Sequence, residues 1–232
     1  MRPVHTPDEL MTLSKTLVGA GASGLLLSGG CDASGKVPLS PYLETVKRIK
    51  EDTPLKVNLH PGLANPEEAE HIALSGADRI SFDLVLDEAV VHNDMHLNVP
   101  PSDHLRSFHS LCRAAPGRVA PHILLGLGEE EKEMEAVRAA VAEEVPCVIL
   151  LSLLGKKVDD WDGRLLRAVK AAAPYRPVLL GCMRPRGRPD VEMAALDAGA
   201  VGIACPSPAT VRSIEDRGWE AEWRKECCAL YR

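Results

Sequence analysis

Short runs of apolar residues recur along this chain and are separated by amphipathic stretches. Most runs hold four to six residues rich in Leu, Ile and Val, without the alternation that marks a half-exposed strand. Such runs are typical of parallel strands that are buried on both faces of a sheet. They predict seven strands, at residues 24–28, 55–59, 79–83, 119–126, 147–152, 177–181 and 201–205.

The stretches between these strands place apolar residues at helical spacing. They predict helices at residues 8–18, 41–51, 66–74, 102–113, 130–143, 161–173, 190–198 and 210–217. Ser40 and Asn65 each precede a proline, so we expect them to be N-caps with proline at the first helical position. Gly-Ala pairs starting at Gly21, Gly76 and Gly199 stand between a helix and a strand, which predicts a left-handed glycine at each position.

Alternation of helix and strand predicts an α/β fold with a parallel sheet and right-handed crossovers. A complete (β/α)₈ barrel needs eight strands and about 250 residues. This chain has 232 residues and opens with a helix. We therefore expect a partial TIM-like barrel of about seven strands that lacks the first one, in a single domain over residues 1–232. Trp219 and Trp223 stand at i and i+4, so residues 218–232 are expected to form a helical extension.

Composition narrows the possible partners. The formal net charge is -6 and aromatic residues make up 3% of the chain, which argues against a nucleic-acid-binding protein. The sequence contains no run of about 18 apolar residues and no apolar segment at its N-terminus, so neither a membrane span nor a secretory signal is expected. Seven scattered cysteines without a paired framework favour free thiols in a reducing cytoplasm.

Candidate chemistry lies at the mouth, the edge of the sheet where the carboxyl ends of parallel strands meet. Asn58 and His60 share one side of a strand, as do Ser81 and Asp83, and each pair is either a ligand contact or part of a capped loop. His92 and His96 have metal-ligand spacing. The intervening Asn93-Asp94 disfavours a helix there, and no metal site is predicted.

Three strand ends carry unusual loops. Ser28-Gly29-Gly30 suits close backbone approach to a ligand, or a tight turn. Residues 124–129 (LLGLGE) end in a carboxylate that opens an acidic helix. Residues 181–188 carry three arginines, which suit a carboxylate or phosphate ligand, or form a solvated basic loop. Cys182 and Cys205 are expected to be small buried hydrophobic residues. P-loop, Rossmann and α/β-hydrolase motifs are absent from the sequence.

Together these loops resemble the motifs of radical S-adenosylmethionine enzymes, in the branch that contains biotin synthase and related lipoyl-type proteins. Ser28-Gly29-Gly30 is similar to the motif that closes the second barrel strand and holds the cofactor's amino group. Residues 124–129 are similar to the fifth-strand motif I-V-G-L-G-E near the adenine. Residues 181–187 are similar to a late-strand motif whose arginine faces the substrate or an auxiliary site.

The resemblance implies two sets of residues, and it assigns no catalytic residue. The implied S-adenosylmethionine contacts are Ser28, Gly29, Gly30, Gly126, Gly128 and Glu129. The implied substrate contacts, which line the mouth, are Asn58, His60, Asp83, His122, Arg184 and Arg186.

The chain departs from that family in one respect. The family binds a [4Fe–4S] cluster through CxxxCxxC after its first barrel strand, and this sequence contains neither that motif nor that strand. The chain is then a fragment or late-started sequence, a short homologue that has lost the cluster, or one half of an assembly. An open barrel also exposes two strand edges, which favours a homo-oligomer or a partner polypeptide.

Three functions follow. The first is radical chemistry, in which reductive cleavage of S-adenosylmethionine gives a deoxyadenosyl radical for hydrogen abstraction, incomplete in this chain alone. The second is a cluster-less barrel that binds S-adenosylmethionine or an anionic metabolite, or serves as a subunit of a larger enzyme. The third is an unrelated barrel lyase or aldolase that uses His60 or Lys56.

Overall fold

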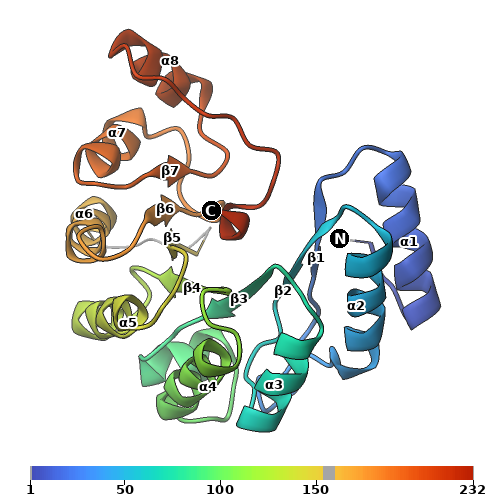
Figure 1. Ribbon diagram of the computed structural model, residues 1–232. Coiled ribbons are helices and arrows are strands. Elements are labelled where there is room, and N and C mark those ends of the chain that lie inside the picture. Colours follow the sequence, from blue (N-terminus) through green and yellow to red (C-terminus); the bar gives the residue numbers. More distant parts are fainter. Residues whose placement is uncertain (1, 154–159, 232) are drawn as a thin grey trace.

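A computed structural model describes residues 2–153 and 160–231. Over these residues, parallel strands form one sheet in which each strand pairs with the next in sequence. The strands are β1 (Gly24–Leu27), β2 (Lys56–Leu59), β3 (Arg79–Asp83), β4 (Val119–Leu124), β5 (Val148–Leu151), β6 (Val178–Leu180) and β7 (Gly202–Ile203). The sheet curls into a half-barrel, so the predicted partial TIM-like fold is confirmed (Figure 1).

Helices cover the outer face of the curled sheet (Figure 1). They are α1 (Pro7–Gly19), α2 (Leu43–Asp52), α3 (Pro66–Leu74), α4 (Pro101–Ala114), α5 (Glu130–Ala142), α6 (Trp161–Ala172), α7 (Pro189–Asp197) and α8 (Pro208–Asp216). Shorter turns are η1 (Ser40–Tyr42), the π-type turn η2 (Val90–Asp94) and η3 (Cys228–Leu230). None of the helices in the described part of the chain has the length and apolar character that crossing a bilayer requires.

Helix boundaries test the predicted caps. Asn65 caps α3, because its Oδ1 accepts the Glu68 backbone N–H at 2.9 Å. The prediction for Ser40 is wrong: Ser40 opens η1, and α2 begins only at Leu43 without a side-chain cap. The three predicted left-handed glycines are confirmed, with φ of 74°, 73° and 112° at Gly21, Gly76 and Gly199.

The two faces of the sheet bury different residues because side chains alternate along each strand. The outer face packs Val57, Ile80 and Val148 against the helices in the main core. The inner face carries a smaller apolar cluster, made of Ala120, Cys147, Ile149, Leu151, Leu179 and Ala229. On β2 and β3, by contrast, the inner face carries polar residues such as Asn58 and Ser81, which are buried and hydrogen-bonded to each other.

The expected helix over residues 218–232 is wrong. Among the described residues 218–231 only η3 is helical, and Trp219 and Trp223 are 43% and 67% exposed. Residues 226–231, called the tail below, turn back to the inner side of the sheet (Figure 1). Long-range contacts fix the tail, and such contacts leave no periodic signal in the sequence.

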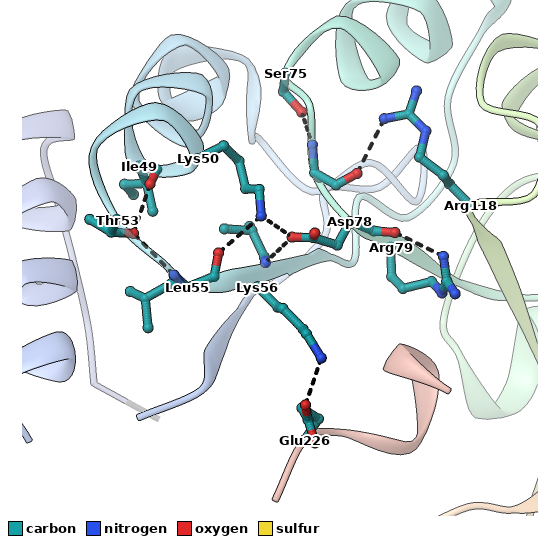
Figure 2. Close-up of polar contacts among 12 residues, drawn as sticks. Ile49, Lys50, Thr53, Leu55, Lys56, Ser75, Asp78, Arg79, Arg118 and Glu226 are labelled. Atoms are coloured by element: carbon teal, nitrogen blue, oxygen red, sulfur yellow. Dashed lines mark hydrogen bonds and ion pairs between the residues drawn. The ribbon is translucent and has the colours of Figure 1, made fainter. Parts of the chain in front are cut away.

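The tail lies against the amino ends of β2 and β3. Lys56 forms an ion pair with Glu226 at 2.6 Å (Figure 2). The Arg79 guanidinium donates to the carbonyls of Ala229 at 3.0 Å and Tyr231 at 2.8 Å. The tail thus closes the end of the half-barrel opposite the mouth.

Asp78 joins three segments beside that closed end. Its Oδ2 accepts from Lys50 Nζ at 2.7 Å and from the Val57 backbone N–H at 2.7 Å. Lys50 also donates to the Leu55 carbonyl at 3.0 Å (Figure 2). One carboxylate therefore ties α2 to β2 and β3, and this fixes the register on which the mouth depends.

Candidate functional site

Three ionisable side chains from adjacent strands converge at the mouth. His60 directly follows β2, Asp83 ends β3, and His122 lies in β4 opposite Asp83 in the strand register. His60 Nε2 is 3.3 Å from Asp83 Oδ2, and His122 Nδ1 is 3.3 Å from Asp83 Oδ1. The two imidazole rings meet edge to face, 5.8 Å apart. The structure thus brings together three of the six predicted substrate contacts, called the triad below.

Contacts within the triad shift the pKa values of Asp83 and His60. Burial alone would raise the pKa of Asp83, but its contacts with His122 and His60 hold that pKa well below its usual range. Burial lowers the pKa of His60, but the hydrogen bond and negative charge of Asp83 outweigh it and raise the pKa. Asp83 is therefore a carboxylate, and His60 is biased towards the imidazolium form.

A second polar layer lies beneath the triad. The Asn58 amide donates to Ser81 Oγ at 2.9 Å, and both residues are buried. Hydrogen bonds with the Cys228 side chain and the Ala229 backbone, with smaller contributions from the His122 imidazole and the Asn58 amide, lower the pKa of Cys227 to about 6 against the effect of burial. Sequence reasoning missed Cys227 because the tail brings it to this layer from far along the chain.

His104 supports the triad from the helix side. It lies on α4, and its Nδ1 is 3.2 Å from the backbone carbonyl of Asp83. Burial lowers the pKa of His104, and its ring packs edge-on against Phe82. A neutral imidazole at this position holds the end of β3. No motif in the sequence marks this histidine.

The predicted Ser28-Gly29-Gly30 loop begins at the end of β1. Gly29 and Gly30 are exposed, and a Cβ on Gly30 would meet no atom within 4 Å. The rest of the loop is held by the segment after β2, where a Cβ on Gly62 would collide with the Gly35 carbonyl. Gly62 therefore has to be glycine, whereas the backbone of Gly30 is accessible to a ligand.

The predicted loop after β4 has a different arrangement. The Gly126 N–H donates to Glu133 Oε1 at 2.6 Å, and the Glu129 N–H donates to Asp87 Oδ2 at 2.8 Å. A Cβ on Gly128 would collide with the Asp87 carboxylate. The glycines here let the protein's own carboxylates approach the backbone. Two of the loop's amides are therefore already engaged, and the Glu129 side chain is exposed.

Arg184, predicted to contact substrate, is buried at 1% exposure. It donates to the carbonyls of Gly181 and Ala204, both at 2.6 Å, and pairs with Glu192 at 2.5 Å. The Thr210 hydroxyl donates to the same carboxylate. The structure therefore commits Arg184 to joining the ends of β6 and β7, and it does not bring Arg184 into the triad.

The other two arginines of this loop, Arg186 and Arg188, are exposed. Arg186 donates to the Cys182 carbonyl at 3.0 Å, and its substrate contact stays a prediction. The expectation that Cys182 and Cys205 are buried is wrong, because both residues are exposed. Cys205 also has a φ of 50°, which places it in a turn beyond β7 rather than in a strand.

Two other sequence candidates lie away from the triad. His92 lies in the π-type turn η2 with its Nδ1 2.8 Å from the Leu97 carbonyl, and His96 has a φ of 56°, so they do not share a helix face. Lys56 starts β2 and pairs with Glu226 at the closed end. A Schiff base at Lys56 would therefore form away from the mouth.

A groove of about 490 Å³ lies outside the mouth. It is lined by side chains of α4, of the segment that precedes α3 and of the segment after β1, including Lys36, Asn65, Asp103, Arg106, Ser107 and His109. None of the triad lines it. The triad is the stronger candidate site because it gathers nitrogen and oxygen ligands on the inner face.

Comparisons with known proteins agree on the fold. No family model matches the chain, and no curated protein matches it. Methylornithine synthase has a TM-score of 0.64 at 17% identity, over 96% of this chain and 75% of that protein. The FeFe-hydrogenase maturase HydG from Carboxydothermus hydrogenoformans has a TM-score of 0.67 at 14% identity, over 94% of this chain and 60% of that protein. Both are radical S-adenosylmethionine enzymes.

An aldolase, QR15, is also similar, with a TM-score of 0.50 at 12% identity over 93% of both chains. At these identities the similarity shows the fold alone. The chain therefore has a partial barrel fold like that of radical S-adenosylmethionine enzymes, and its chemistry has to be argued from its own residues.

Proposed function

We propose that this chain is a radical S-adenosylmethionine-type barrel of the biotin synthase-like branch that binds S-adenosylmethionine across its mouth. The observation that carries the proposal is the accessible backbone of Ser28-Gly29-Gly30 at the end of β1. The last ladder bond of β1 with β2 joins the Leu27 carbonyl to the His60 N–H at 3.0 Å. The glycine loop therefore starts beside the triad, at the rim where such barrels place their ligands.

The residues present do not fit a [4Fe–4S] cluster. Cys112 and Cys147 are buried, and burial raises the pKa of each thiol to about 12, which opposes thiolate ligation. Within the described residues, the triad is the only group of three metal-ligating side chains, and it contains no cysteine. Radical formation would therefore need a cluster supplied by another polypeptide or by sequence outside this chain.

Ligand binding tests the proposal directly. Isothermal titration of the full chain should show one site for S-adenosylmethionine, with weaker binding of methionine alone. Gly30→Val should weaken binding by about tenfold or more, because it places a side chain where the ligand approaches. Gly19→Val is the matched control, since a Cβ there also meets no atom within 4 Å but lies on α1. Unchanged affinity in Gly30→Val, or no binding at all, contradicts the proposal.

Iron analysis tests the inference that the chain alone does not hold a [4Fe–4S] cluster. After anaerobic reconstitution, the chain alone should hold well under one cluster per molecule and should not cleave S-adenosylmethionine. A stoichiometric cluster with cofactor cleavage would contradict the inference that this chain is incomplete.

The open edge of the sheet favours a subunit role as the second candidate function. Leu26 of β1 is 48% exposed, although the strands are otherwise largely buried. Leu26 pairs with Asn58 and so projects to the inner face beside the open edge, where a second polypeptide that pairs with β1 and covers this part of the face would bury it. Sedimentation of the wild type against Leu26→Ser should then show loss of association, and a monomeric wild type at micromolar concentration contradicts this candidate.

A further inference from the structure

The triad has the composition of a metal centre. His60 Nε2, His122 Nδ1 and the Asp83 carboxylate offer two nitrogen ligands and one oxygen ligand from three adjacent strands, all within 4.8 Å of one another. We propose that these three side chains bind one divalent transition-metal ion, Zn²⁺ or Fe²⁺, at the mouth of the barrel. The sequence alone predicted no metal ligand here, because the three residues are far apart along the chain.

The spacing of the ligand atoms supports a shared ion. Bonds of about 2.0–2.1 Å from a metal to imidazole nitrogen and carboxylate oxygen place neighbouring tetrahedral ligands roughly 3.4 Å apart. Each imidazole nitrogen lies 3.3 Å from its own oxygen of the Asp83 carboxylate, His60 Nε2 from Oδ2 and His122 Nδ1 from Oδ1. A direct charged hydrogen bond is shorter, at about 2.7–2.9 Å. The contacts are thus longer than a direct charged hydrogen bond, and an ion among these side chains would contact both imidazoles and one or both oxygens of the carboxylate.

The donor set selects the kind of metal. Two imidazoles with one carboxylate suit Zn²⁺ and non-haem Fe²⁺, whereas Mg²⁺ and Ca²⁺ prefer oxygen ligands. One carboxylate also leaves a net charge of +1 on the bound centre if both imidazoles are neutral. Such a centre attracts anionic ligands to the mouth.

Exposure of the triad leaves room for a further ligand. The side chains of His60, Asp83 and His122 are 25%, 31% and 14% exposed. Structural metal sites are closed by four protein ligands, whereas sites with three protein ligands keep a position for water or substrate. The proposed site is therefore of the open kind, and the ion would bind water or a carboxylate or carbonyl oxygen there.

The surrounding protein holds the ligands in place. The His104 imidazole contacts the Asp83 backbone carbonyl, and β4 fixes His122 opposite Asp83. The edge-to-face contact of the two triad imidazoles restricts both rings. Ligands fixed in this way lose little freedom on binding a metal.

This inference goes beyond the proposed function, because metal binding is measured without S-adenosylmethionine. A chain that binds metal but no cofactor disproves the proposed function and leaves this inference intact. A chain that binds cofactor but no metal does the reverse.

Cobalt titration tests the site in the full chain after treatment with a chelator. We expect one Co²⁺ per chain with visible d–d bands, displaced by Zn²⁺, and no comparable binding of Mg²⁺. Asp83→Asn and His122→Gln should each weaken Co²⁺ binding by at least about tenfold. His71→Gln, an exposed histidine on α3, is the matched control and should bind like the wild type.

The spectrum separates this site from one built on thiols. A strong sulfur-to-cobalt charge-transfer band, lost in Cys227→Ser, would place the ion on the tail cysteines and overturn the proposal. Equal affinity in wild type and Asp83→Asn would overturn it as well, as would the absence of binding. Circular dichroism of each variant shows whether it is folded, and Asp83→Asn preserves the shape of the side chain.

Discussion

The two sides of the mouth differ in what their charged side chains contact. At the ends of β6 and β7, Arg184 is 1% exposed and pairs with the buried Glu192. At the ends of β2, β3 and β4, the triad is partly open to solvent, and its ionic contacts are 3.3 Å long. The Arg184 side thus has short ionic contacts that solvent does not reach, whereas the triad side has longer ionic contacts that solvent reaches.

This difference separates structure from chemistry within one fold. A buried charge with short contacts to internal partners has no capacity left for a ligand, and its removal leaves an uncompensated charge. Partly exposed groups with strongly perturbed pKa values are typical of functional sites. Residue type alone does not distinguish the two sides, since both were expected to line the mouth.

The largest expected effect is on the closed side. Arg184→Met should lower the free energy of unfolding by about 3–5 kcal/mol, because it leaves Glu192 buried without its cation. Urea denaturation followed by circular dichroism measures this loss. The double variant Arg184→Met/Glu192→Leu should recover part of it. A loss below about 1 kcal/mol would mean that the pair is not isolated from water.

The contacts of the triad are longer than those of Arg184, so we expect the strands that carry the triad to be stabilised mainly at their amino ends, where Arg79 binds the tail. Arg79→Met should lower the free energy of unfolding by about 1–3 kcal/mol, because the carbonyls of Ala229 and Tyr231 lose their donor. Thermal unfolding measures the loss, and limited proteolysis should then cut the tail sooner than in the wild type. A protected tail in this variant would show that its other contacts suffice.

Removing the negative charge of Asp83 should have a larger effect on the pKa of His60 than on the free energy of unfolding. In Asp83→Asn, we expect the pKa of His60 to fall below its ordinary value, because burial remains while the negative charge is lost. NMR titration of the imidazole, with chelator present, measures this. A pKa that stays raised would assign the shift to another group.

The same variant has a defined pH signature. The raised pKa of His60 stabilises the wild type below the unfolded pKa of about 6.5, and this contribution disappears as pH rises through the folded value. The stability advantage of wild type over Asp83→Asn should therefore be larger at about pH 6 than at about pH 8. Equal differences at the two pH values would contradict this.

The smallest structural effect is a difference in thiol reactivity near the triad. The pKa of Cys227 is lowered to about 6, whereas burial raises that of Cys112 and Cys147 to about 12. Iodoacetamide near pH 6.5 should therefore modify Cys227 and leave the other two intact, as peptide mass analysis would show. His122→Gln should slow the reaction at Cys227, because His122 helps to lower the pKa of that thiol, and an unchanged rate would contradict this contribution.

Local patterns predicted the fold well where short-range forces decide it. The strand at residues 79–83 and the helix at 66–74 have their predicted boundaries, because apolar runs and an Asn-Pro cap act within a few residues. Ser40 failed because the 3₁₀ turn η1 occupies the expected first helical turn. Strand alternation predicted that His60 shares a strand side with Asn58 and Asp83 with Ser81, and in the structure His60 and Asp83 meet at the mouth.

The rest depended on contacts between distant segments. The sequence contains no signal that Glu192 takes up Arg184, or that the tail adopts an irregular path across the inner face. The mutual distances of the triad follow from strand register, which Asp78 and its partners fix at the other end of the sheet. Register is a tertiary property and is invisible to periodicity.

The position of the tail has a consequence for biosynthesis. Glu226 follows its partner Lys56 by 170 residues, and Ala229 follows Arg79 by 150. At a translation rate of about 5–20 residues per second, the earlier strands wait roughly 10–30 s for these partners. During that interval the inner face of β2 and β3 is uncovered on the ribosome. Nascent chains of this protein are therefore expected to depend on chaperones until the last turn, η3, has emerged.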